Sequence, residues 1–122
     1  MKEGDVILTQ IPQSDGTIKS RPALVLRELP PFRDLLVCGI STQTHQAVRG
    51  FDEVIDPDFI DTGLIADSVV RLGFLAVLPR SKVAGSIGRL SHARYELLLR
   101  RLSAYLTENI AKTPAKEDTD DR

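Results

Sequence analysis

Ser20–Leu26 (SRPALVL) and Leu35–Gln43 (LLVCGISTQ) are two apolar runs of strand length, rich in β-branched residues, and they decide how this chain folds. Because only a short proline-containing segment joins them, we expect them to pair as neighbouring antiparallel strands. The start of one strand then lies beside the end of the other. This pairing places Arg21 and Ser41 at the same edge of a sheet. A cation and a hydroxyl at one sheet edge indicate a site for a phosphate group.

The composition is that of an ordinary globular protein. The chain has 122 residues, of which 42% are hydrophobic and 27% are charged, so one domain with one core is expected. No apolar run approaches the roughly 18 residues of a membrane span, and the first residues lack the apolar core of a signal peptide. The one cysteine, Cys38, stands in an apolar run where a core residue is expected. These features predict a cytoplasmic protein without disulfides.

The charged residues are unevenly distributed along the chain. The formal net charge is −1 at pH 7, and residues 113–122 hold four acids against two bases. We predict a barrel domain over residues 1–111 and an acidic, disordered tail over residues 112–122. Because the remaining body is close to neutral, nucleic-acid binding would depend on local clusters of arginines.

Turn signals about every ten residues predict a small α+β protein. Besides the two opening runs, strands are expected at Val6–Ile11, Phe51–Ile55, Ser68–Leu72 and Gly85–Leu90, with short helical turns at Asp56–Gly63 and Leu78–Val83. A helix is expected after the N-cap Ser91, with an apolar stripe that runs to Ile110 and with Arg94 and Arg101 on the opposite side. The whole describes a strongly bent antiparallel sheet, barrel-like, with a C-terminal helix.

Five motifs stand in an order that resembles the MazF/PemK family of toxin endoribonucleases from type II toxin–antitoxin systems. They are Gly4–Leu8, Ser20–Leu26, Ile40–Gln43, Ser68–Leu72 and Ile87–Ser91, and the similarity extends from about Gly4 to about Leu106. The resemblance implies an SH3-like barrel, a homodimer, and metal-independent cleavage of single-stranded RNA without a cofactor. It also implies a cognate antitoxin whose C-terminal segment occupies the RNA groove.

The same resemblance assigns the catalytic residues. The family's catalytic arginine falls on Arg21, and its catalytic threonine falls on Ser41, where serine retains the hydroxyl. The planar donors of an arginine suit the charge that develops on a phosphate during RNA cleavage. From the residues alone, two alternatives stay open: a surface ion pair for Arg21, and a hydroxyl bonded to the backbone for Ser41.

Further residues are predicted to bind the RNA, namely Lys19, Thr42, Gln43, His45, Arg71 and Arg80. Arg71 stands inside an apolar strand, where a buried ion pair would explain it as well as a position at the barrel rim. His45 and His92 form an alternative acid–base pair. No cluster of His, Cys, Asp and Glu has the spacing of metal ligands, so no metal site is predicted.

The leading prediction is an mRNA interferase that uses 2′-hydroxyl attack and leaves a 2′,3′-cyclic phosphate. One alternative is a non-catalytic interaction module, like the gyrase-poisoning toxins of the same architecture. Those toxins are associated with a tryptophan near the end of the terminal helix, and this chain has no tryptophan. The other alternative is a relative that binds RNA without cutting it, because the near-neutral body offers little phosphate neutralisation.

Overall fold

The computed structural model describes residues 1–12, 14–56 and 62–110. In this part of the chain it contains β1 (Asp5–Pro12), β2 (Ile18–Leu29), β3 (Asp34–Ser41), β4 (Glu53–Ile55), β5 (Ser68–Leu78), β6 (Val83–Arg89) and α1 (His92–Leu106). Short 3₁₀ turns stand at Thr44–Gln46 and Arg80–Lys82. The turn predicted at Asp56–Gly63 and the predicted acidic tail fall largely or wholly on residues outside the described part.

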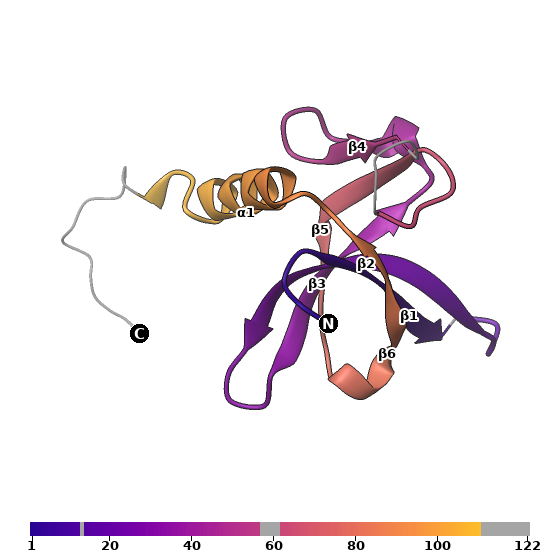
Figure 1. The fold of residues 1–122 in the computed structure, drawn as a ribbon. Helices are drawn as coiled ribbons and strands as arrows, with labels where there is room; N and C mark the ends of the chain where they lie inside the picture. The colour runs from indigo at the N-terminus through magenta and orange to yellow at the C-terminus, as the bar shows by residue number, and fades with distance from the viewer. Residues whose placement is uncertain (13, 57–61, 111–122) are drawn as a thin grey trace.

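The six described strands form one antiparallel sheet in the order β4-β5-β3-β2-β1-β6. Figure 1 shows how strongly the sheet bends, with α1 packed at one side and its C-terminal end extending away from the strands. The predicted α+β class, the SH3-like bent sheet and the C-terminal helix are confirmed.

Alternation along the strands creates apolar layers on both faces of the sheet. Leu24 and Leu26 of β2 belong to the main core, which α1 covers with Leu98 and Leu102. The intervening β2 residues, Ala23 and Val25, face the other side of the sheet. They belong to a second cluster, whose other members are Ile7, Leu35 and Val37. Arg21 has the same parity along β2 as Ala23, so its side chain belongs to this second face.

The helix begins as predicted but ends earlier. The Ser91 hydroxyl accepts a hydrogen bond from the Arg94 amide at 3.3 Å, which is the expected N-cap. The α-helix ends at Leu106, so the predicted helical stripe through Ile110 is wrong. Arg94 and Arg101, expected on the side opposite the stripe, both pair with Glu53 of β4, at 2.9 and 3.0 Å.

Strand β5 is longer than the sequence predicts. Its predicted end is Leu72, yet the strand continues to Leu78, and the residues from Leu75 to Leu78 pair with β3. A glycine followed by exposed apolar residues carries no local strand alternation, so only the pairing partner reveals this part of the strand. The second predicted turn is present at Arg80–Lys82. No helix in the described ranges is long and apolar enough to cross a membrane.

Cys38 lies in the main core, as predicted. Burial, with a smaller contribution from the Asp52 carboxylate, raises the pKa of its thiol from 9.0 to about 12. The protonated thiol is therefore the form that the folded protein retains.

We predict a specific loss of stability at alkaline pH. Because the folded pKa exceeds the unfolded one, the Cys38 contribution is fully present below pH 9 and is lost as pH rises toward about 12. The stability advantage of the parent over Cys38→Ala should shrink by up to about 1.4 kcal/mol per pH unit above this lower limit. Urea unfolding of both proteins at several pH values measures it. A constant difference between the two would contradict the assignment, since Tyr95 and the other groups titrate in both.

Candidate active site

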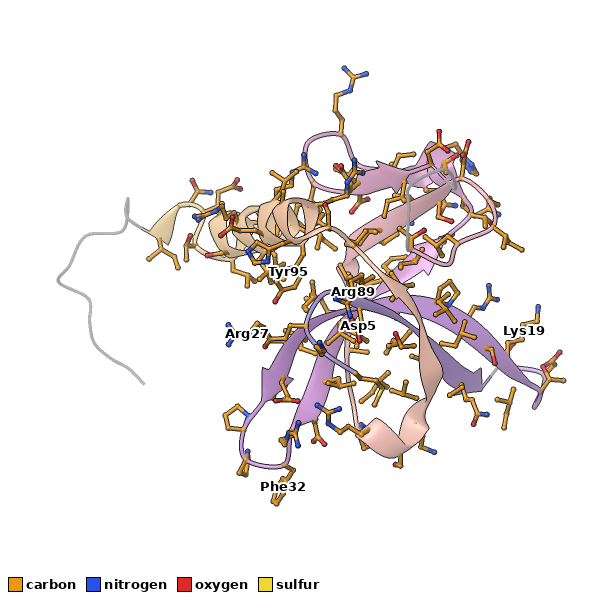
Figure 2. All side chains as sticks on the ribbon, viewed as in Figure 1. Asp5, Lys19, Arg27, Phe32, Arg89 and Tyr95 are labelled. Carbon is orange, nitrogen blue, oxygen red and sulfur yellow. The ribbon has the colours of Figure 1, made fainter. Side chains whose placement is uncertain are left out.

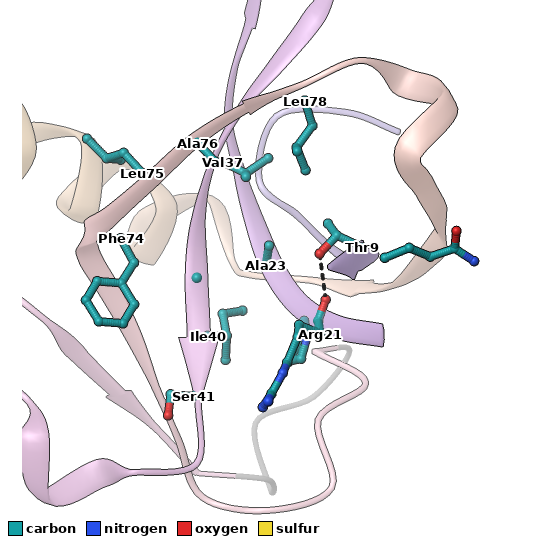
Figure 3. A pocket seen from close by; sticks show the side chains of 13 residues that line it. Thr9, Arg21, Ala23, Val37, Ile40, Ser41, Phe74, Leu75, Ala76 and Leu78 are labelled. Carbon is teal, nitrogen blue, oxygen red and sulfur yellow. Dashed lines mark hydrogen bonds between the residues drawn. The ribbon is translucent and has the colours of Figure 1, made fainter. Parts of the chain in front are cut away.

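A pocket of about 550 Å³ opens on the second face of the sheet. Residues of β1, β2, β3 and β5 line it, and most of the lining side chains are apolar. The polar exceptions are Thr9, Gln10, Arg21 and Ser41. Figure 3 shows Arg21 and Ser41 at the ends of their strands, on the same side of the pocket.

The register of β2 and β3 brings these two predicted residues together. The paired residues run as far as Ala23 and Gly39. Arg21 precedes Ala23 by two residues and Ser41 follows Gly39 by two, so both lie just beyond the end of this ladder, on the face of Ala23 and Gly39, and both line the pocket. The structure therefore brings a guanidinium and a hydroxyl to one end of the pocket.

Arg21 has an anchored backbone and an uncommitted side chain. The buried Thr9 hydroxyl donates a hydrogen bond to the Arg21 carbonyl at 3.2 Å. Within the described residues, Arg21 is exposed and has no carboxylate partner, so the surface ion pair is not seen there. Most other arginines of that part are paired with carboxylates: Arg27, Arg33, Arg71, Arg80, Arg89, Arg94, Arg100 and Arg101. The Arg21 guanidinium is thus available to an anionic ligand.

The Ser41 hydroxyl is oriented by the backbone that follows it. Its Oγ accepts a hydrogen bond from the Gln43 amide at 3.0 Å. This contact is the backbone bond considered above as the alternative for Ser41. It uses the oxygen only as an acceptor, so the hydroxyl proton can still be donated to a ligand.

Four other predicted RNA-binding residues surround the same edge. Thr42, Gln43 and His45 are exposed in the segment that leaves β3, and Lys19 is exposed two residues before Arg21. Figure 2 shows Lys19 at the opposite end of β2 from the hairpin tip, which Phe32 marks. The other histidine, His92, lies in a separate depression beside Asp5 and Arg89. The structure thus gives the two histidines different surroundings rather than one shared site.

Arg71 forms a buried ion pair, which is one of the two explanations that the sequence offered for an arginine inside an apolar strand. Its Nε lies 3.2 Å from Oδ2 of Asp52, and the side chains are 15% and 2% exposed. The Asp52 carboxylate also accepts the amides of Leu72 and Val48, at 3.0 and 2.9 Å. Gln46 accepts a further bond from Arg71 at 3.0 Å. The donors of Arg71 are therefore directed at protein partners.

Arg80 lies far from the Arg21 edge. It pairs with Glu28 and donates to the Arg33 carbonyl at 3.1 Å, near the tip of the β2–β3 hairpin. Along an extended strand, the seven residues from Arg21 to Glu28 span about 23 Å. Arg80 is therefore a hairpin residue in this structure, and a single copy of the chain does not bring it to the pocket.

Thr9, Gln10 and Phe74 are among the lining residues that were not selected from the sequence. Thr9 is opposite Arg21 in the β1–β2 register, a relation that the predicted strands allow but that depends on the length of the hairpin loop. Phe74 falls beyond the predicted end of β5. Among the described residues, no group of three or more His, Cys, Asp or Glu could hold a metal ion.

Comparison with known proteins gives a consistent result. Residues 2–106 match the sequence model of a family described as the PemK-like, MazF-like toxin of type II toxin–antitoxin systems. The structure is similar to that of the Mycobacterium tuberculosis toxin MazF-mt6, with a TM-score of 0.62 and 25% sequence identity over 84% of this chain and 95% of that chain. No curated protein sequence matches the chain. The family match spans all the strands that line the pocket.

The buried Asp52 carboxylate leads to a stability prediction. Asp52→Asn leaves the Arg71 guanidinium partly buried without a counter-ion, so the free energy of unfolding should fall by about 3 kcal/mol. The exposed Glu96–Arg100 pair provides the control, and Glu96→Gln should cost less than about 0.5 kcal/mol. Urea denaturation of the three proteins measures both changes. If both variants lose the same free energy of unfolding, the buried Asp52–Arg71 pair contributes no more to stability than the exposed pair does.

Proposed function

This chain belongs to the PemK-like, MazF-like toxin family of type II toxin–antitoxin systems, and from that premise we propose that it is a metal-independent endoribonuclease. Its substrate is single-stranded RNA, cut at a short sequence, and a cognate antitoxin neutralises it. The observation that supports this most is that the uncommitted Arg21 guanidinium and the Ser41 hydroxyl line the same pocket.

Such a pair suits a reaction in which RNA supplies its own nucleophile. The 2′-oxygen attacks the adjacent phosphorus and loses its proton to solvent, the bond from phosphorus to the 5′-oxygen breaks, and that oxygen gains a proton. The products are a 2′,3′-cyclic phosphate and a free 5′-hydroxyl. The protein has to stabilise the extra negative charge on the non-bridging oxygens while these bonds exchange.

In our proposal, Arg21 binds the scissile phosphate through its planar donors and delivers the proton to the leaving oxygen through water. The Ser41 hydroxyl donates a hydrogen bond to a non-bridging oxygen of the same phosphate. Each preorganised donor of this kind contributes about 3–4 kcal/mol to the stabilisation of a transition state. The Thr9 contact on the Arg21 backbone and the Gln43 contact on Ser41 reduce the reorganisation that binding requires.

The RNA on either side of this phosphate would meet the remaining exposed residues of the edge. We propose contacts from Lys19, Thr42, Gln43 and His45. Arg71 and Arg80 would have to leave Asp52 and Glu28 to bind phosphate, so we propose that they act mainly through the structure that they stabilise.

We also propose a homodimer. Helix α1 exposes Leu97, Tyr105 and Leu106, and the last part of β5 exposes Val77. Exposed apolar side chains of this kind are a surface that a second copy can cover. A toxin of this type would act in the cytoplasm, where its RNA substrate and its antitoxin are present.

Cleavage and its dependence on Arg21 can be tested together. A long RNA incubated with the protein in EDTA should show breaks at a restricted sequence with cyclic-phosphate ends. Arg21→Ala should lower the rate by about a hundredfold to a thousandfold, whereas Ser41→Thr, which retains the hydroxyl, should stay close to the parent. Ser41→Ala should be slower than Ser41→Thr.

Arg49 provides the matched control, because it is the other exposed arginine of the described residues without an ion pair. Arg49→Ala should cleave at the parental rate with an unchanged melting temperature. If Arg21→Ala also cleaves at the parental rate, the catalytic assignment fails. Intact RNA that is retarded in a gel would instead identify a non-cleaving binder, and no interaction with RNA would favour the non-enzymatic module.

A further inference from the structure

Strand β5 contains a bulge that changes the direction of Phe74. Arg71 pairs with Gly39 and Leu75 pairs with Cys38, so the three β5 residues between them, Leu72 to Phe74, face no additional residue of β3. Bulges of this kind re-aim side chains and are common beside functional sites. Here the bulge carries the phenyl ring of Phe74 across to β3.

The ring lies over a position that has no side chain. A Cβ atom placed on Gly39 would be 3.4 Å from the Cβ of Phe74 and 3.7 Å from its Cδ2. Ser41 follows Gly39 by two residues and so faces the same side of β3. Phe74 and Arg21 line the same pocket, and β3, which carries Gly39 and Ser41, lies between their strands. Figure 3 shows Phe74, Ser41 and Arg21 around this pocket.

A fixed cation covers part of the ring. The guanidinium carbon of Arg71 lies 4.2 Å from the ring centroid of Phe74, within the range of a cation–π contact. Arg71 is itself held by Asp52 and Gln46. Phe74 as a whole is nevertheless 57% exposed. The fold therefore holds a large aromatic side chain in place and leaves much of its surface free.

We propose that Phe74 is a stacking platform for a nucleobase next to the phosphate bound by Arg21 and Ser41. Single-stranded RNA is commonly recognised by bases that stack on aromatic side chains while cations track the backbone. The pocket offers both features, an exposed aromatic ring and an uncommitted arginine at one end, and its walls are mostly apolar. The proposal rests on the function proposed above, since it assigns one subsite of that substrate.

The charge of the pocket favours RNA over a second copy of the chain as its occupant. A protein surface that covered the pocket would desolvate Arg21, and it would have to supply a carboxylate to avoid a large cost. A polynucleotide brings the phosphate and the planar base together. Arg71 and Gly39 then act as positioning residues, because they hold the ring without touching the base.

The absence of tryptophan from the sequence allows a direct test of stacking. Phe74→Trp introduces a single indole at the proposed platform, and Phe32→Trp introduces one at the hairpin tip, where Phe32 is 82% exposed. The probe is a 2′-O-methyl oligonucleotide of the mapped cleavage sequence, which lacks the nucleophile. Indole fluorescence should be quenched by the oligonucleotide in Phe74→Trp and unchanged in Phe32→Trp. If the oligonucleotide does not quench Phe74→Trp, the stacking proposal is wrong. Emission that changes only with protein concentration would also overturn it, and would indicate a contact between copies at this position.

Kinetics separate this subsite from the catalytic pair. Phe74→Ala and Phe74→Leu should both raise KM by about tenfold to a hundredfold with a smaller change in kcat, and Phe74→Trp should retain the parental KM. Unchanged melting temperatures in these variants would show that the fold is retained. If Phe74→Leu binds as the parent does, an apolar wall suffices and the stacking role is wrong. If the parent cuts RNA and Phe74→Ala has the parental KM, the stacking role of Phe74 is wrong and the endoribonuclease proposal is unaffected. If the parent leaves RNA intact, both proposals are wrong.

Discussion

The antiparallel register between β2 and β3 is the constraint on which the candidate site depends. A shift of one residue would turn every side chain of a strand to the opposite face, and Arg21 would then point toward the main core. The register is fixed because Leu24 and Leu26 must be buried under α1 while Ala23 and Val25 face the second cluster. The same apolar alternation that stabilises the fold therefore sets Arg21 and Ser41 on one face.

Arg21 differs from most other arginines of the described residues because it is not paired with a carboxylate. Glu53 binds two arginines of α1, and Asp52 and Glu28 bind Arg71 and Arg80, so these cations join elements that lie far apart in the sequence. Arg21 has no such partner among the described residues, and it stands beside a pocket. A chain with a net charge of −1 can thus present a local cation to an anion.

Asp52 connects this site to the rest of the sheet. It lies just before β4, it is almost fully buried, and it binds both Arg71 and the Leu72 amide where β5 begins to bulge. The position of Phe74 over Gly39 follows from that bulge. A carboxylate that stands just before β4 therefore holds β5 at the point where the bulge that carries Phe74 begins.

The sequence by itself determined the strands β1 to β3, the capped start of α1 at Ser91, and the placement of Arg21 and Ser41 on one face of the sheet. These features depend on local alternation, on a cap residue and on a short connection, all of which act between near neighbours in the chain. Only the tertiary structure decided that β5 extends to Leu78, that Arg94 and Arg101 pair with Glu53, and that Phe74 reaches the pocket. Each of these features depends on a partner more than 30 residues away or on a bulge. Distant partners and bulges leave no periodic signal in the sequence, because the position of the partner is fixed only when the sheet has formed.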